Sequence, residues 1–242
     1  MPQNRDIAAY LERMEFFDRI GRPVPRSIQA HDAADRFYVL SAVSRATLPG
    51  GTTHQISADI AQVLSPNDPD MRGVLFYCVT ELMNNVMQHS GAVGSTAAQY
   101  YPQNDEVELA IADTGIGIRD GLCENPTLRN KIGSDLDALI LAKKPAVSGK
   151  AYPQGPYFDL QNAGLGLFML SRITALTVGY MYLWSGNAFL FQDGNLSDKP
   201  VPTNPFTGTA VAVRLKRNMV YSIAEMMKEI REEIQDAEGK DS

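Results

Sequence analysis

The chain has 242 residues, 44% of them hydrophobic and 21% charged, which predicts a soluble globular protein with one large domain or one domain and a small annex. Its net charge of −6 disfavours phosphate backbones and anionic membrane surfaces, so we expect no nucleic-acid or membrane partner. The N-terminal sequence does not resemble a signal peptide, and no apolar run is long enough to span a membrane. The two cysteines, Cys78 and Cys123, follow no zinc-binding or disulfide pattern. We therefore expect a reduced, cytoplasmic protein.

The first 65 residues contain regular elements but no motif that indicates chemistry. Apolar residues at helical spacing predict a helix over residues 5–20, which Gly21 ends. β-forming residues predict a strand at 37–43, and residues 57–64 read as a short helix. We interpret residues 1–65 as an N-terminal annex that serves packing or the formation of a homodimer.

The longest predicted helix covers residues 71–89. It ends at Ser90-Gly91, because glycine suits the left-handed residue that closes a helix. The turn-forming residues 102–105 then separate two strands, 96–101 and 106–112, which predicts a β-hairpin.

Residues 118–163 form a long, irregular segment rich in glycine and proline. They contain one helical piece near 134–144, which Ser134 and Asp137 would open as a capping box. Connections of this length are typical of functional lids, and we interpret the segment as a lid.

The rest of the chain again mixes helices and strands. We predict a helix from Gly164 to 174, a hairpin of strands 178–184 and 188–191, a strand at 208–215, and an amphipathic helix at 219–235. Paired strands mixed with helices predict an α+β fold, a sandwich with helices on one face of a mixed, mostly antiparallel sheet. We expect residues 66–218 to form the main domain and 219–242 a C-terminal helix with a charged tail.

The first group of chemically informative residues lies on the helix at 71–89. Glu81, Asn85 and His89 are four residues apart and therefore stack along one helix face. The asparagine oxygen is a ligand type that magnesium accepts beside phosphate oxygens, and the carboxylate could activate a water. The alternative is a solvated polar face of an amphipathic helix.

A second group follows the strand at 106–112. Asp113 at the strand end is an acceptor for the exocyclic amine of adenine, and Gly115 and Gly117 permit close approach of the backbone to a ligand. The alternative is a glycine-rich turn capped by Asp113 itself.

Two further glycine motifs complete the set. Asn162, Gly164 and Gly166 stand at the mouth of a helix, whose first N–H groups can bind phosphate, although a lid hinge without ligand would look the same. Gly208-Thr209 places a hydroxyl at a strand start.

In this order and spacing, the motifs over roughly residues 70–216 resemble those of the GHKL superfamily of gyrases, heat-shock chaperones, histidine kinases and MutL proteins. Glu81 to Asn85 resembles its N box, Asp113 to Gly117 its first glycine box, and Gly164 to Leu167 its second. A Rossmann site is not supported, because the glycines at 164 and 166 lack a preceding strand and a third glycine, and no Walker loop is present.

The resemblance implies a Bergerat-type site for ATP and Mg²⁺. Asn85 would coordinate the metal, Asp113 would bind adenine with Thr209 nearby, and Glu81 would be the catalytic base. The remaining residues that it assigns to the nucleotide are His89, Gly115, Gly117, Asn162, Gly164 and Gly166. Gln88 departs from the pattern, since many histidine kinases have lysine there to help hold phosphate. The lid lysines that could compensate are Lys131, Lys143, Lys144 and Lys150, although lysines on a lid are more often simply solvated.

None of the three histidines lies in a long helix pair, so we do not expect an orthodox autophosphorylating histidine kinase. His89-Ser90 instead resembles the N-box ending of anti-sigma-type serine kinases of bacterial switch systems. Two functions remain: a slow ATPase or serine/threonine kinase-like module, and a non-hydrolysing ATP sensor whose lid controls binding to a regulatory partner protein.

Overall fold

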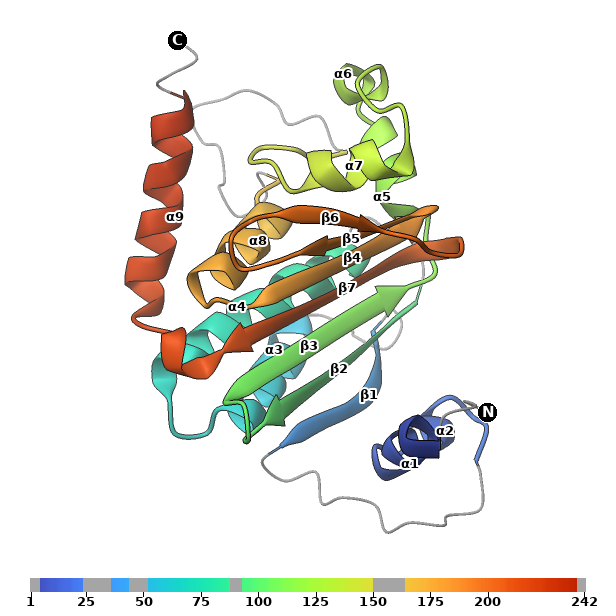
Figure 1. The fold of residues 1–242 in the computed structure, drawn as a ribbon, viewed down its shortest axis with the longest axis vertical. Coiled ribbons are helices and arrows are strands. Elements are labelled where there is room, and N and C mark those ends of the chain that lie inside the picture. The colour runs from blue at the N-terminus through green and yellow to red at the C-terminus, as the bar shows by residue number, and fades with distance from the viewer. Residues whose placement is uncertain (1–4, 24–35, 44–51, 88–92, 150–163, 239–242) are drawn as a thin grey trace.

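The computed structural model describes residues 5–23, 36–43, 52–87, 93–149 and 164–238. The strands are β1 (Phe37–Val43), β2 (Gly94–Tyr101), β3 (Glu106–Asp113), β4 (Tyr180–Gly186), β5 (Ala188–Gln192), β6 (Asp198–Val201) and β7 (Phe206–Lys216). The helices are α1 (Arg5–Arg13), α2 (Phe16–Arg19), α3 (Thr52–Leu64), α4 (Pro69–Asn85), α5 (Gly117–Cys123), α6 (Pro126–Arg129), α7 (Asp135–Ala142), α8 (Gly166–Leu176) and α9 (Ile223–Glu238) (Figure 1).

The strands form one sheet in the order β1-β2-β3-β7-β4-β5-β6. The predicted α+β fold is confirmed, but the sheet is not mixed: every pair among the described strands is antiparallel. The short connections β2–β3 and β4–β5 impose this direction, because a tight turn can join only antiparallel strands. β7 enters between β3 and β4, so Thr209 is aligned with Asp113 on one side and with Ser185 on the other.

Alternating side chains give the sheet a core face, which α3, α4 and α8 cover (Figure 1). In β3, Val107, Leu109 and Ile111 point into this core, with 0–4% of each side chain exposed. Asp113 continues the same alternation. The strand therefore delivers a carboxylate to the end of the apolar layer.

A side-chain cap and a proline stabilise the start of α4. The Asp68 carboxylate accepts a hydrogen bond from the backbone N–H of Met71 at 3.0 Å, and Pro69 occupies the first turn, where its missing N–H is harmless. Seven side chains of α4 are buried in the core: Met71, Val74, Leu75, Cys78, Val79, Leu82 and Met83. Their burial fixes the rotation of the helix and therefore the directions of its other side chains.

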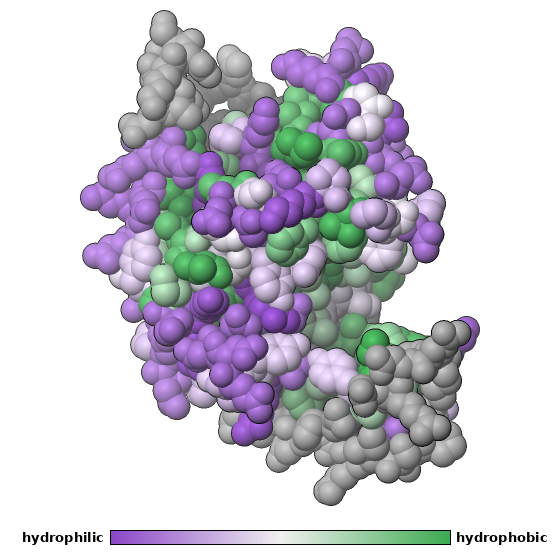
Figure 2. Space-filling view, in the orientation of Figure 1, coloured by the Kyte–Doolittle hydropathy of each residue, from purple (hydrophilic) through white to green (hydrophobic). Residues whose placement is uncertain are grey.

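The C-terminal helix α9 packs against α4 and α8 through the buried residues Met226 and Ile230. Ile223 lies so close to Gly73 that a methyl group there would approach its side chain to 3.1 Å. Hydrophilic side chains dominate the surface along α9 and around α6, with smaller hydrophobic patches between them (Figure 2). No helix in the described part of the chain has the length and apolar character needed to cross a membrane.

Two predictions in the N-terminal part need correction or extension. The helix expected over 5–20 is broken into α1 and α2, because Glu15 adopts a left-handed conformation with φ of 55°. The strand at 37–43 is confirmed as β1, and the short helix at 57–64 is longer, starting at Thr52. β1 pairs with β2, and α3 contributes Ile60 and Leu64 to the main core.

The expected irregular lid is more ordered than predicted. Its first part folds into α5, α6 and α7, whereas residues 150–163 lie outside the described part. The helical piece near 134–144 is confirmed: Ser134 caps α7 by accepting a hydrogen bond from the N–H of Asp137 at 3.1 Å. The edge strand β6 was not predicted, since its sequence Asp-Lys-Pro-Val lacks a strand pattern.

Candidate functional site

One cavity collects most of the predicted site residues. It lies between the C-terminal part of α4, the end of β3, the first half of β7, the start of α5 and the N-terminus of α8. The predicted residues that line it are Glu81, Asn85, Asp113, Gly117, Gly164, Gly166 and Thr209. Gly115 is not in the wall but hydrogen-bonds Asp113, and His89 and Asn162 lie outside the described residues.

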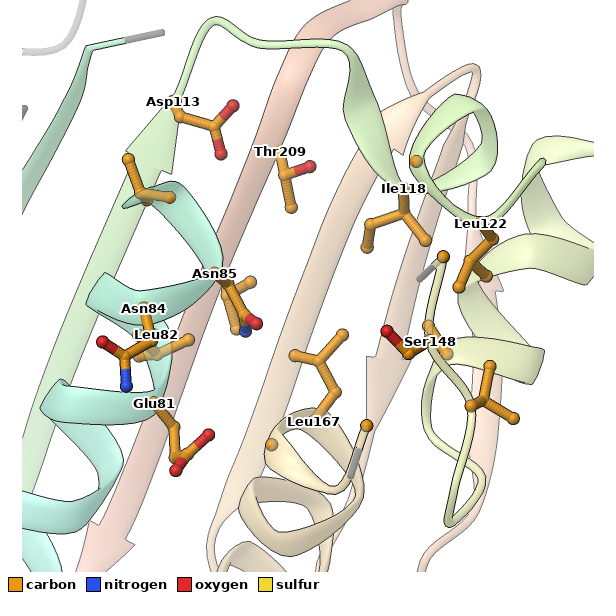
Figure 3. Close-up of a pocket in the computed structure, with 18 of the residues that line it drawn as sticks. Glu81, Leu82, Asn84, Asn85, Asp113, Ile118, Leu122, Ser148, Leu167 and Thr209 are labelled. Carbon is orange, nitrogen blue, oxygen red and sulfur yellow. The ribbon is translucent and has the colours of Figure 1, made fainter. Parts of the chain in front are cut away.

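The α4 helix supplies two polar groups one turn apart. Glu81 and Asn85 extend into the cavity, with Asp113 and Thr209 toward its other end (Figure 3). Burial raises the pKa of Glu81 to about 7, because a low-dielectric setting disfavours the charged carboxylate. Glu81 therefore exchanges a proton near neutral pH, as a general base requires.

Asp113 is a fixed acceptor at the end of β3. Only 6% of the residue is exposed, and its Oδ1 accepts a hydrogen bond from the backbone N–H of Gly115 at 2.7 Å. Burial raises the pKa of Asp113, whereas the nearby backbone N–H groups of Gly115 and Thr209 lower it because they favour the ionised form.

The loop after Asp113 touches β7 so closely that glycine is required. Gly208 has φ of 99°, and a Cβ atom on it would lie 2.1 Å from the carbonyl oxygen of Asp113. Gly117 has φ of 79°, and a Cβ atom there would lie 2.8 Å from Ser185 Oγ. The two glycines allow three chain segments to meet beside the Asp113 carboxylate.

The α8 helix directs its N-terminus at the cavity. Gly164, Leu165 and Gly166 line the wall, and the N-cap residue Leu165 offers no side-chain acceptor. The first N–H groups of a helix have no partner within it, and the helix dipole adds positive potential there. A Cβ atom on Gly166 would lie 2.7 Å from Glu81 Oε2, so glycine also permits the contact between α8 and the Glu81 carboxylate.

Sequence reasoning missed the apolar wall and one serine. Long-range packing brings together Val86, Ile111, Ile118, Leu122, Leu167 and Val211. Ser185 at the end of β4 is 3% exposed and hydrogen-bonds both Gly208 and Ile118. Its sequence context, a strand followed by Gly186-Asn187, predicts only a turn, so no local signal could have identified it.

Positive side chains do not line the cavity among the described residues. Lys143 is not part of the cavity wall: its ammonium donates to Gln192 Oε1 at 2.7 Å and forms an ion pair with Asp198. The described residues also contain no group of three or more His, Cys, Asp or Glu side chains that could hold a metal alone. A cation here would need further oxygen ligands from its ligand or from water.

No protein-family model matches the chain, and no curated protein shows a significant match to it.

Proposed function

We propose that the cavity binds ATP with Mg²⁺ and that the chain is a Bergerat-type nucleotide-binding module of the GHKL superfamily. The main support is the Asp113 carboxylate, which is buried beside an apolar wall and held by a hydrogen bond from the N–H group of Gly115. A carboxylate accepts a hydrogen bond from the exocyclic amine of adenine, whereas guanine has a carbonyl oxygen at the equivalent position. The apolar wall suits a flat base, so the cavity selects adenine.

The other side of the cavity suits a triphosphate. The N–H groups at the N-terminus of α8 are available to phosphate oxygens, and Asn85 presents an amide to the same space. Asn85 would hold Mg²⁺ through its side-chain oxygen; the ion, when bound, would neutralise charge on the phosphates. Magnesium keeps several waters and takes few protein ligands, so a single side-chain oxygen is compatible with its binding.

Glu81 gives the site a candidate base for phosphoryl transfer. With a pKa of about 7, it is roughly half ionised at neutral pH, and it lies one helical turn from Asn85. Its carboxylate would take a proton from a water or from a hydroxyl of a partner protein. We infer a slow ATPase or serine/threonine kinase-like module of a bacterial regulatory system.

The sensor function is the second candidate, and the charge of the cavity favours it. Phosphoryl transfer generally uses positive groups to stabilise the transition state, yet no lysine or arginine lines the described part of the wall. Turnover would then be negligible or below about one per second. ATP would instead alter the lid and its affinity for a regulatory partner protein.

Nucleotide titration by calorimetry tests the binding proposal. Wild type should bind ATP at least about tenfold more tightly than GTP, and Asp113→Asn should lower ATP affinity about tenfold or more, since a hydrogen bond to a charged group contributes ~1.5–3 kcal/mol. Asp120→Asn, an exposed aspartate of α5 outside the cavity wall, is the matched control and should bind like wild type. Equal ATP and GTP affinity, or full ATP binding by Asp113→Asn, would contradict the proposal.

A further inference from the structure

The face of the sheet opposite α3, α4 and α8 carries a ridge of aromatic side chains on one half. In Figure 1 the strands pass in front of α3 and α4, so this face is toward the viewer. The alternation of β4 buries Met181 and Leu183 in the core and turns every second residue outward. Neighbouring ring centroids lie 4.7–6.0 Å apart in this aromatic ridge, which consists of Tyr180, Tyr182, Trp184, Phe189, Phe191 and Phe206. All six residues are partly exposed.

The other half of the same face is a trough with a floor of small side chains. They come from β2, β3 and β7 and are aligned across the strands: Ser95, Ala97, Ala110, Ala112, Ala210 and Ala212. On β4, Tyr182 is aligned with Ala212 and Trp184 with Ala210, so the floor meets the ridge directly. The trough encloses about 350 Å³. Alanine is a poor strand former, so strand formation does not account for five alanines on a partly exposed face.

The charged side chains that border the trough already have partners within the chain. The Arg214 guanidinium lies 2.8 Å from the Glu108 carboxylate and 3.3 Å from that of Glu106. It also lies over the rings of Tyr101 and Tyr180, at 5.1 and 4.7 Å from their centroids. Covering the trough therefore leaves no unpaired charge at this border, a cost that would oppose association.

We propose that this face is the interface between two copies of the chain, with the aromatic ridge of each copy seated in the trough of the other. Each copy carries both halves, so a two-fold axis that runs along the strands, over the boundary between β7 and β4, brings each ridge over the opposite trough. Sheets that pack face to face lie about 10 Å apart and interdigitate their side chains. A ring opposite an alanine fits this spacing. The helices and both nucleotide cavities then lie on the outer sides of the dimer.

The area of the face is sufficient for a specific dimer. Five neighbouring strands, from β2 to β5 in the sheet order, lie about 4.8 Å apart, and about three residues of each strand point outward. The footprint is roughly 24 by 20 Å, or about 500 Å². Two copies bury about 1,000 Å² before the relief of ridge and trough is counted, which reaches the lower limit for a specific interface. Aromatic side chains are also enriched at the centres of such interfaces.

The test follows the mass of the whole chain and the fluorescence of Trp184 without nucleotide. Light scattering should give about twice the chain mass of 26.6 kDa at about 100 µM and approach the monomer mass on dilution. Trp184 is the only tryptophan and belongs to the ridge, so its quenching by acrylamide should increase over the same dilution. A chain that remains monomeric at about 100 µM overturns the proposal, as does a change of mass without a change in quenching.

Two variants place the interface on the trough. Ala212→Lys puts an ammonium beside Tyr182 and should raise the dimer dissociation constant at least about hundredfold, because the two-fold axis brings the charge into the interface twice. Ala110→Lys, on the adjacent strand, should do the same. Both positions are partly exposed in the single chain, so the monomer should keep its fold, which a thermal melt verifies. Ala224→Lys, on the exposed side of α9, is the matched control and should dimerise like wild type. A dimer that persists in both trough variants overturns the proposal.

Discussion

The partly buried carboxylate of Glu81 should reduce the stability of the folded chain at high pH. Burial raises its pKa from the ordinary 4.5 to about 7, so the folded state holds the proton more tightly than the unfolded state. This stabilisation is complete below pH 4.5 and is lost as the pH rises to about 7. At about 1.4 kcal/mol for each pKa unit, the loss approaches roughly 3 kcal/mol.

The Glu81→Gln substitution keeps the shape of the side chain and removes its titratable carboxyl group. We expect the variant to be more stable than wild type by roughly 2–3 kcal/mol at pH 8, and about equally stable at pH 4.5, because glutamine resembles the protonated acid. Denaturant unfolding of both proteins across this pH range, without nucleotide, gives the difference. Glu232→Gln serves as control, since the Glu232 side chain is 60% exposed on α9 and should show no such trend.

A stability difference between Glu81→Gln and wild type that stays constant from pH 4.5 to 8 would contradict a raised pKa of Glu81 in the folded state. The same variant also separates the two proposed functions. In the enzyme, Glu81→Gln retains ATP affinity but loses about 10²–10⁴-fold of phosphoryl transfer, measured with pure protein and with cell extract as a source of partner. Indistinguishable turnover of the two proteins under every condition would favour the sensor.

Three further outcomes are expected. Asn85→Ala should abolish the effect of Mg²⁺ on ATP affinity, and a wild-type titration that is the same with and without the metal would remove Asn85 from the metal site. Gly208→Ala should lower the free energy of unfolding by more than about 2 kcal/mol, because its Cβ atom would lie 2.1 Å from the Asp113 carbonyl; a thermal melt like that of wild type would contradict this. ATP should increase hydrogen-exchange protection in residues 118–163, and equal protection in both states would make this segment a static part of the fold.

Local patterns were sufficient for much of the fold. The period of apolar residues predicted α4 and α8, turn residues predicted the hairpins β2–β3 and β4–β5, and the capping pair predicted the start of α7 at Ser134. These signals act between residues a few positions apart, so one sequence is enough to read them. They failed where local propensity was weak, as in β6, or where a single left-handed residue, Glu15, interrupted a regular period.

The motifs also predicted that Glu81, Asn85, Asp113 and Thr209 belong together, and all four line one cavity. The sequence alone determined which groups are present and on which elements they lie. Only the tertiary structure placed β7 between β3 and β4, which brings Thr209 beside Asp113 and makes Ser185 their neighbour. Only burial raised the pKa of Glu81 toward neutrality. Both effects depend on partners many residues away, since strand order and desolvation arise from packing that no local pattern encodes.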